Sequence, residues 1–436
     1  MAEHFDTVVV GGGSGGLAYA RQAASHGARV ALIERAELGG TCVNRGCVPK
    51  KMLWTAANHV REEADMDEAG VGIPGGLDFA TLKARADAKI GRIRDSFDEA
   101  LADCGVTLIR GEATCHAPDR IVVGDRTLSA DALVLAHGAL PADLDLDGIA
   151  LAETSNDVLS WTSVPERIAI LGGGYIGCEF AAIFACLGSE VTVADPSDRL
   201  IGPFDEDLGR AARRSLERLG VTVRLGATPT SITEGDTGLT VAFENADPVT
   251  ADRVVNATGR TPNIAAIGPL AERLQVAESG ALAVDARLAT NVPGVHAVGD
   301  IADRLPLTPV ATRDGKALAD MLYGDAPDAC PVDLKLVAKT CFVMPPVAEV
   351  GTPSGGAQDG TRLSDGVTAP DRDATTLHKI ATDDAGRLTG VALWEDDAPD
   401  LIALAAALIA AGATRDDLFR ATGVHPSFAE TLVGRP

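Results

Sequence analysis

Two cysteines, Cys42 and Cys47, stand five positions apart at the predicted start of a helix. They can form a reversible disulfide only if the backbone between them is irregular, which Gly46 permits. A helix N-terminus and nearby cations favour the thiolate form of a cysteine. The cations here are Arg45, Lys50 and Lys51. A zinc site is excluded because no second Cys/His pair at ligand spacing lies nearby. A chance pair of core thiols remains the alternative, and core thiols are also expected at the other six cysteines.

One histidine near the C-terminus has the neighbour that a proton-transfer group needs. His425 precedes Glu430 by five positions. A carboxylate that holds one imidazole nitrogen fixes the tautomer and raises the basicity of the ring, so the other nitrogen can exchange a proton with a thiol. The other seven histidines are expected to be structural or surface residues.

A dinucleotide-binding unit precedes the cysteine pair. The pattern predicts a buried strand over 5–10, a glycine turn, a helix over 17–26 and a strand over 29–33 that ends in Glu34. Gly11 makes the turn, Gly13 lets the backbone approach a pyrophosphate, and Gly16 lets the helix pack on its strand. The helix N-terminus faces the phosphates, and Glu34 can bind ribose hydroxyls.

The same unit recurs later in the chain. A strand is predicted over 167–171, a helix over 179–187 and a strand over 190–194 that ends in Asp195. The turn glycines are Gly172, Gly174 and Gly177, and the third glycine precedes the acid by 18 residues in both copies (16 to 34 and 177 to 195). Segments 130–141 and 251–262 also match as strands that end in a glycine turn. The fold class is therefore α/β with two doubly wound, Rossmann-like dinucleotide-binding domains, as in a flavin enzyme reduced by a nicotinamide.

The choice of nicotinamide coenzyme depends on charge. Asp195 would repel the 2′-phosphate of NADPH and accept hydrogen bonds from free ribose hydroxyls. Arg199 is the one cation in the segment that follows, and it is a counter-argument. The sequence favours NAD(H) over NADP(H).

Composition excludes several classes of protein. The 436 residues imply two to four domains, and 38 basic against 62 acidic residues give a net charge of −24. This field disfavours nucleic acid and anionic lipid as partners. Eight cysteines are too few for a disulfide-stapled secreted fold. No apolar run is long enough for a membrane span and no secretory signal is recognised, so a cytoplasmic protein is expected, with no metal site.

The run from Gly39 to Lys51 resembles the redox-active disulfide motif of the flavoprotein pyridine nucleotide-disulfide oxidoreductases, and its Pro-Lys-Lys ending is most similar to the glutathione reductases among them. Further motifs follow in the family's order: Tyr175 in the second glycine turn, Val298-Gly299-Asp300, 307–311 and 425–430. The resemblance covers almost the whole chain.

The resemblance implies a role for each of these residues. Cys47 would be the sulfur nearest the flavin, and Cys42 the outer thiol that attacks the substrate. Lys50 and Glu179 would pair beside the flavin, and His425 with Glu430 would come from the partner subunit of a homodimer. Asp300 would bind the ribityl chain, Thr308 would be the N-cap of a helix aimed at the flavin, and Tyr175 would cover the ring. The residues expected to bind FAD or the nicotinamide nucleotide are Gly11, Gly13, Ser14, Gly16, Glu34, Thr41, Gly138, Asp300, Thr308, Gly172, Gly174, Tyr175, Ile176, Gly177, Asp195 and Gly259.

Substrate specificity follows less directly. Arg21 matches a glutathione-contacting arginine of the family, and Lys316 stands where another arginine is common. Phe97 replaces a substrate-facing tyrosine, and Ala136-His137-Gly138 replaces the family's Ala-Thr-Gly. Glutathione disulfide is the expected substrate, with an amidated or shortened variant open. Dihydrolipoamide dehydrogenase, mercuric reductase and a non-catalytic flavin-binding redox sensor are the alternatives.

The resemblance also implies a domain organisation. An FAD domain is expected over 1–145, completed by 269–332. It would enclose a nicotinamide nucleotide domain over 146–268 and be followed by an α+β interface domain over 333–436.

Overall fold

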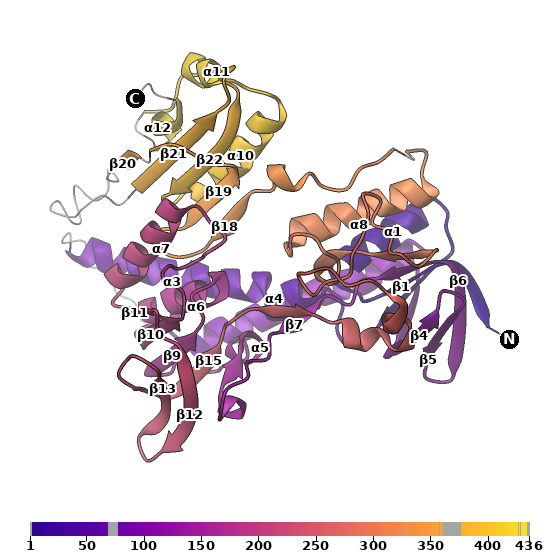
Figure 1. Ribbon diagram of the computed structural model, residues 1–436, viewed down its shortest axis with the longest axis horizontal. Coiled ribbons are helices and arrows are strands. Elements are labelled where there is room, and N and C mark those ends of the chain that lie inside the picture. Colours follow the sequence, from indigo (N-terminus) through magenta and orange to yellow (C-terminus); the bar gives the residue numbers. More distant parts are fainter. Residues whose placement is uncertain are drawn as a thin grey trace. The chain divides into compact units, whose positions relative to one another are not determined.

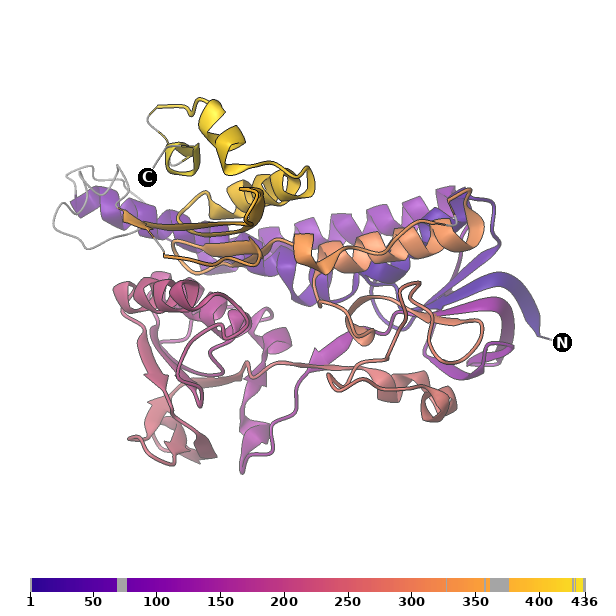
Figure 2. The ribbon, with the colours of Figure 1, turned by 45° about the horizontal axis from the view of Figure 1, so that its top comes forward.

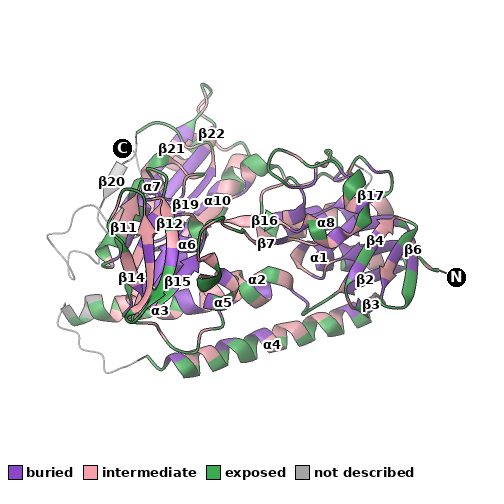
Figure 3. Cartoon of the chain, turned by 60° about the horizontal axis from the view of Figure 1, so that its bottom comes forward, coloured by how far each residue is buried: buried purple, intermediate pink, exposed green. Residues whose placement is uncertain are grey.

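The computed structural model describes residues 2–68, 77–326, 328–356, 358–360, 376–425, 427 and 429–433. The chain divides into two compact units (Figure 1). The first comprises Met1–Lys51, Lys83–Asp143 and Arg260–Val332, and the second comprises Met52–Leu82, Leu144–Gly259 and Asp333–Pro436. Helices α3 (Cys47–Glu68) and α4 (Phe79–Asp103) contribute residues to both units. Most of α4 is exposed or half-buried (Figure 3).

The first unit is built on a seven-stranded sheet in the order β3-β2-β1-β6-β5-β4, with β17 paired to β6. The strands are β1 (Glu3–Val10), β2 (Val30–Glu34), β3 (Thr107–Arg110), β4 (Ala113–Ala117), β5 (Arg120–Val123), β6 (Arg126–Leu135) and β17 (Val295–Ala297). Strand β1 is parallel to both β2 and β6. The carboxyl ends of these three strands therefore meet at one edge, where open α/β sheets bind their ligands.

Apolar side chains of β1 are buried on both faces of this sheet. Val9 packs in a cluster with Leu17 of α1 (Ser14–Ser25) and Leu318 of α8 (Thr308–Tyr323). Val8 packs on the opposite face, in a cluster with residues of the 3₁₀ segments η2 (Ile264–Ile267) and η3 (Pro269–Arg273). A continuous apolar strand is typical of a sheet covered on both sides. Figures 1 and 2 show α8 running beside α1.

Short elements complete the first unit. Helix α2 (Gly40–Arg45) carries the first cysteine, and η4 (Gly299–Ile301) follows β17. Strand β7 (Ala139–Pro141) pairs antiparallel with β16 (Arg260–Pro262). This pairing joins the segment that follows β6 to the residues at which the chain re-enters the first unit, from Arg260 onward.

The second unit contains a five-stranded parallel sheet in the order β11-β10-β9-β15-β8 and a three-stranded antiparallel sheet, β12-β13-β14. The strands are β8 (Glu153–Thr154), β9 (Arg167–Leu171), β10 (Glu190–Asp195), β11 (Thr222–Leu225), β12 (Pro229–Gly235), β13 (Gly238–Phe243), β14 (Val249–Ala251) and β15 (Arg253–Asn256). The 3₁₀ segment η1 (Ile149–Leu151) and helices α5 (Ser155–Val158), α6 (Tyr175–Cys186) and α7 (Glu206–Arg218) accompany them.

A five-stranded antiparallel sheet in the order β18-β19-β22-β21-β20 ends the second unit. Its strands are β18 (Lys339–Cys341), β19 (Val347–Gly351), β20 (Gln358–Gly360), β21 (Thr376–Thr382) and β22 (Leu388–Trp394), and the 3₁₀ segment η5 (Leu334–Leu336) precedes them. Helix α10 (Ala398–Ala410) packs on this sheet through Ile402 and Ala405, and α11 (Arg415–Arg420) and α12 (Ala429–Val433) follow. The side of α10 that faces away from the sheet is also apolar: it carries Leu404, whose side chain is 64% exposed.

The α/β fold class with two nucleotide-type sheets is confirmed; the second sheet is parallel, and the first also contains the antiparallel pairs β4–β5 and β5–β6. The predicted strands match β1, β2, β9 and β10 to within two residues. Both turn helices begin earlier than predicted, at Ser14 and Tyr175, because each glycine turn leads directly into its helix. The three domain boundaries remain a prediction. None of the helices in the described part of the chain has the length and apolar character needed to span a membrane.

Candidate functional site

The first glycine turn is shaped by close backbone contacts at two glycines. Gly11 has φ +111°, and a Cβ atom there would lie 2.2 Å from the carbonyl oxygen of Ala136. A Cβ atom on Gly16 would lie 1.9 Å from the carbonyl oxygen of Gly11. Only glycine fits at either position, as the sequence predicted for the turn and for helix packing.

The acid after the second strand holds this turn in place. The Gly12 amide donates to Oε2 of Glu34 over 2.6 Å, and the Ala36 amide donates to Oε1 over 2.8 Å. The carboxylate is thereby oriented at the edge of the sheet, and its unused lone pairs can accept from ribose hydroxyls.

The second unit repeats this arrangement. Gly172 has φ +114°, and a Cβ atom on Gly177 would lie 2.0 Å from the carbonyl oxygen of Gly172. The Gly173 amide donates to Oδ2 of Asp195 over 2.5 Å, and the Ser197 amide donates to Oδ1 over 2.8 Å. The duplication seen in the sequence is therefore present in the hydrogen bonds as well. Of the other predicted residues of this turn, Gly174 is the N-cap of α6, and Ile176 is half-buried in its first turn.

The first turn suits a bound FAD. Asp300 lies half-buried after β17, and burial raises the pKa of its carboxyl, which the charge of Arg260 partly opposes. A half-buried carboxyl is stabilised when it accepts hydrogen bonds from hydroxyl groups, such as those of a ribityl chain. Both ring nitrogens of His137, two residues after β6, lack a partner among the described residues. Burial, with the nearby Arg35, lowers the pKa of that imidazole to about 4, so the ring is neutral. Asp300 and His137 thus offer polar groups that a bound ligand can hydrogen-bond.

The cysteine pair lies where two helices meet. Cys42 is in α2 and Cys47 begins α3, and Gly46 separates them. A Cβ atom on Gly46 would lie 2.9 Å from the carbonyl oxygen of Thr41, so the irregular backbone that the sequence predicted requires glycine. The two sulfurs are hydrogen-bonded to each other. Cys42 is half-buried and Cys47 is exposed.

The surroundings of Cys42 oppose ionisation of its thiol. The pKa of its thiol is raised, first by the hydrogen bond with Cys47 and then by burial, and negative charge on Cys47 adds to the effect. Hydrogen bonds from Thr308 and Ser14 oppose this rise. The nearby cations therefore do not make Cys42 a thiolate. Cys42 therefore needs a base in order to ionise.

Thr308 also has a different role from the predicted one. Helix α8 has Leu307 as its N-cap, without a side-chain capping bond, and Thr308 is already its first residue. The Thr308 hydroxyl lies 3.6 Å from Sγ of Cys47 instead. The hydroxyl contacts the sulfurs, and this contact takes the place of the predicted capping bond.

Arg260 is a site residue that the sequence reasoning missed. Its guanidinium donates to the carbonyl oxygen of Ala139 over 2.5 Å and to Oγ1 of Thr41 over 3.3 Å, and its charge acts on Asp300. The match between segments 130–141 and 251–262 was a signal for it, because Arg260 directly follows Gly259, the turn glycine of the second segment.

Two further glycines have left-handed backbones. Gly138 has φ +67° and Gly259 has φ +145°, and open space surrounds the position of a Cβ atom at each. The Gly138 carbonyl accepts from the Asn263 amide over 2.9 Å. Their backbones can therefore take part in nucleotide binding, which remains a prediction.

Glu179 and Tyr175 lie on the helix that follows the second turn. The Glu179 carboxylate is buried and accepts from the Phe342 amide over 3.0 Å. The Tyr175 side chain is exposed. Lys50 belongs to the other unit, so its predicted pairing with Glu179 remains a prediction.

The histidine and the acid near the C-terminus meet as predicted. Nδ1 of His425 lies 3.0 Å from Oε2 and 3.1 Å from Oε1 of Glu430. The Ser427 amide donates to the same carboxylate, and this bond, followed by His425, lowers the pKa of Glu430. The His425 side chain is 83% exposed, so its Nε2 side is available to another group.

The predicted substrate residues lie on paired helices. Arg21 on α1 and Lys316 on α8 are both exposed, and these two helices pack together. Phe97 packs against the core cluster that contains Leu101, so it is a packing residue of the first unit.

Comparison with known proteins identifies relatives over the whole chain. Residues 5–315 match the family model described as pyridine nucleotide-disulphide oxidoreductase. The chain is 35% identical to a glutathione reductase of Burkholderia cepacia, with 98% of each chain covered, and 32% identical to one of Nostoc sp., with 99% of each covered. It is also 29% identical to a dihydrolipoyl dehydrogenase of Haloferax volcanii, over 99% of this chain and 96% of that one.

Proposed function

Because the chain belongs to the pyridine nucleotide-disulphide oxidoreductase family and is thus an oxidoreductase that acts on a disulfide with FAD and a nicotinamide nucleotide, we propose that it uses NADH to reduce glutathione disulfide or a close variant. The observation that carries this proposal is the hydrogen-bonded pair of Cys42 and Cys47, whose Cys47 contacts Thr308 at the start of α8. The sensor alternative would lack this pair or the histidine, and the chain retains both.

FAD would be held by the first glycine turn, Glu34 and Asp300, and when bound it supplies a two-electron couple beside the cysteines. The protein's own chemistry is thiol–disulfide exchange. Reduction of a Cys42–Cys47 disulfide gives two thiols. The Cys42 thiolate then attacks one sulfur of the substrate, which forms a mixed disulfide and releases the first thiol. The Cys47 thiolate attacks Sγ of Cys42, which releases the second thiol and closes the disulfide again.

His425 would be the base that this sequence requires. The raised pKa of Cys42 means that its proton must be removed before attack. The Glu430 carboxylate holds Nδ1 of His425, which orients Nε2 for that proton and for its later transfer to the leaving thiolate.

We also propose a homodimer in which His425 serves the cysteine pair of the partner subunit. The imidazole is 83% exposed on its own chain. The outer face of α10 presents Leu404 and Leu408 to solvent, and an exposed apolar face of this kind is typical of an interface.

Arg21 and Lys316 would bind the carboxylates of glutathione disulfide. Lipoamide has no carboxylate for them, so these residues favour glutathione over the dihydrolipoamide alternative. The test is a comparison of rates with glutathione disulfide, its diamide, lipoamide and mercuric ion, each with NADH and NADPH. A higher kcat/KM for lipoamide than for both glutathione compounds would contradict the substrate, and a purified protein without flavin would contradict the enzyme class.

Asp195→Ala is expected to lower the preference for NADH over NADPH by about tenfold. The loss of the charge removes both the repulsion of a 2′-phosphate and the acceptor for ribose hydroxyls. The ratio of the two kcat/KM values measures this preference. Glu34→Ala is the matched change in the first turn and should lower FAD retention while leaving the coenzyme ratio unchanged. An unaltered ratio in the Asp195 variant would contradict the role of this acid.

A further inference from the structure

The segment 196–205, which follows Asp195, is tied to the second glycine turn at one end. The Ile201 amide donates to the carbonyl oxygen of Gly173 over 2.8 Å. Ile201 is buried and has φ +45°, a conformation that is strained for a β-branched residue and persists only when its surroundings fix it. Arg199 donates from Nη2 to the carbonyl oxygen of Gly202 over 2.7 Å, so the guanidinium is turned back onto its own segment.

The other end of the segment is tied to the C-terminal sheet. Oε2 of Glu349, on β19, accepts from the Asp205 amide over 2.8 Å. Lys339, directly opposite on β18, pairs with Oε1 of Glu349 over 2.5 Å and donates to the carbonyl oxygen of Pro203 over 3.3 Å. Lys339 also lies over the Phe204 ring. Three consecutive residues are thus held by one cross-strand ion pair.

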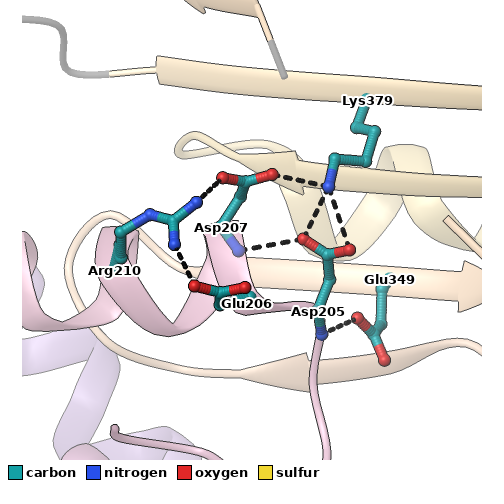
Figure 4. Close-up of polar contacts among 6 residues, drawn as sticks. All are labelled: Asp205, Glu206, Asp207, Arg210, Glu349 and Lys379. Atoms are coloured by element: carbon teal, nitrogen blue, oxygen red, sulfur yellow. Dashed lines mark hydrogen bonds and ion pairs between the residues drawn. The ribbon is translucent and has the colours of Figure 1, made fainter. Parts of the chain in front are cut away.

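Lys379 on β21 completes this contact (Figure 4). Its ammonium lies 2.9 Å from Oδ1 of Asp205 and 2.5 Å from Oδ2 of Asp207, at the start of α7. The lysine side chain is only 7% exposed. A buried charge that loses its partner is strongly destabilised, so these pairs favour a single arrangement of the segment. We call Lys339, Glu349 and Lys379 the sheet anchor.

We propose that the sheet anchor positions segment 196–205 for coenzyme selection, with Asp195 presented to the ribose and Arg199 kept away from the site of a 2′-phosphate. This inference rests on the proposed function, namely NADH bound at the second glycine turn. The anchor residues act through the segment and are positioning residues. They give the C-terminal sheet a part in choosing the coenzyme.

Lys339→Met tests the proposal with little risk to folding, because this side chain is partly exposed. The variant is expected to bind NAD⁺ about tenfold more weakly and to have a correspondingly higher KM for NADH, while kcat at saturating NADH stays within about twofold. Its preference for NADH over NADPH is expected to fall more than tenfold, by about 30-fold, because the freed Arg199 can also meet a phosphate and strengthen NADP⁺ binding. Binding is measured on the oxidised holoenzyme by titration with NAD⁺ and NADP⁺, and Glu349→Gln provides a second variant.

Three further variants separate positioning from stability. Lys339→Arg keeps the charge and should retain the wild-type KM. Arg387→Met removes a surface ion pair with Asp383 in the turn between β21 and β22 and should leave the binding of both coenzymes unaffected. Adding Arg199→Ala to Lys339→Met should remove the gain in NADP⁺ binding. Wild-type affinities for NAD⁺ and NADP⁺ in both anchor variants, with or without a lower melting temperature, would overturn the proposal. A wild-type enzyme that prefers NADPH would instead contradict the proposed coenzyme.

Discussion

Cys42→Ser is expected to lower the rate of disulfide reduction by roughly 1000-fold or more, while NADH still reduces the flavin. The substitution removes the sulfur that attacks the substrate and leaves the nucleotide sites unchanged. Two assays measure the effect: thiol release from glutathione disulfide, and bleaching of the flavin absorbance by NADH under anaerobic conditions.

Cys47→Ser is the matched control for this change. Both variants should lose turnover, but they should differ in the long-wavelength absorption of a thiolate beside oxidised flavin. Cys47 is the sulfur that the family resemblance places nearest the flavin, and the pKa of the Cys42 thiol is raised, so the band is expected from Cys47. The band should therefore persist in Cys42→Ser and be absent in Cys47→Ser. A band only in the Cys47 variant would reverse the assigned roles.

His425→Gln is expected to lower kcat for disulfide reduction by about 100- to 10,000-fold at neutral pH. Because the pKa of Cys42 is raised, a variant without the base depends on solvent to ionise this thiol. The remaining activity should accordingly rise as the pH is raised above neutral, and a flat pH profile would contradict the role of the base. Glu430→Gln should lower kcat by a smaller factor, since it removes only the carboxylate that orients the imidazole ring. His4→Gln, which changes an exposed histidine of the first unit, should have no effect.

The same two variants test the shared site. When Cys42→Ser and His425→Gln subunits are mixed and allowed to exchange, a mixed dimer has one intact site if each site draws on both chains. Random exchange then restores about a quarter of the wild-type activity. No recovery, despite confirmed subunit exchange, would place both groups within one chain.

The features that the sequence predicted well are those fixed by local chemistry. Gly11, Gly16 and Gly46 could be assigned because each sits where a side chain would collide with a backbone carbonyl a few residues away or on the adjacent strand. The His425–Glu430 pair was predictable for a similar reason, since its members are only five positions apart.

The missed features depend on contacts between distant parts of the chain. The sequence indicates cationic and helical neighbours that favour a thiolate in the cysteine pair, but the pKa of Cys42 is governed first by Cys47 and then by burial. Thr308 looked like a helix cap until the structure brought its hydroxyl to a sulfur 261 positions away. Lys379 belongs to no recognisable motif, and its partner Asp205 lies 174 positions away in the sequence. No local pattern reveals such pairings.

The bare backbone at Gly46 has a consequence for how a catalytic round can end. A side chain there would be pressed against the Thr41 carbonyl, and the turn would have to open. Cys42 could still capture half of a substrate, but Cys47 would no longer reach it to expel that half. Such a protein would react with one substrate molecule and then stay in the mixed-disulfide form. Repeated turnover would therefore depend on Gly46 having a hydrogen atom in the place of a methyl group.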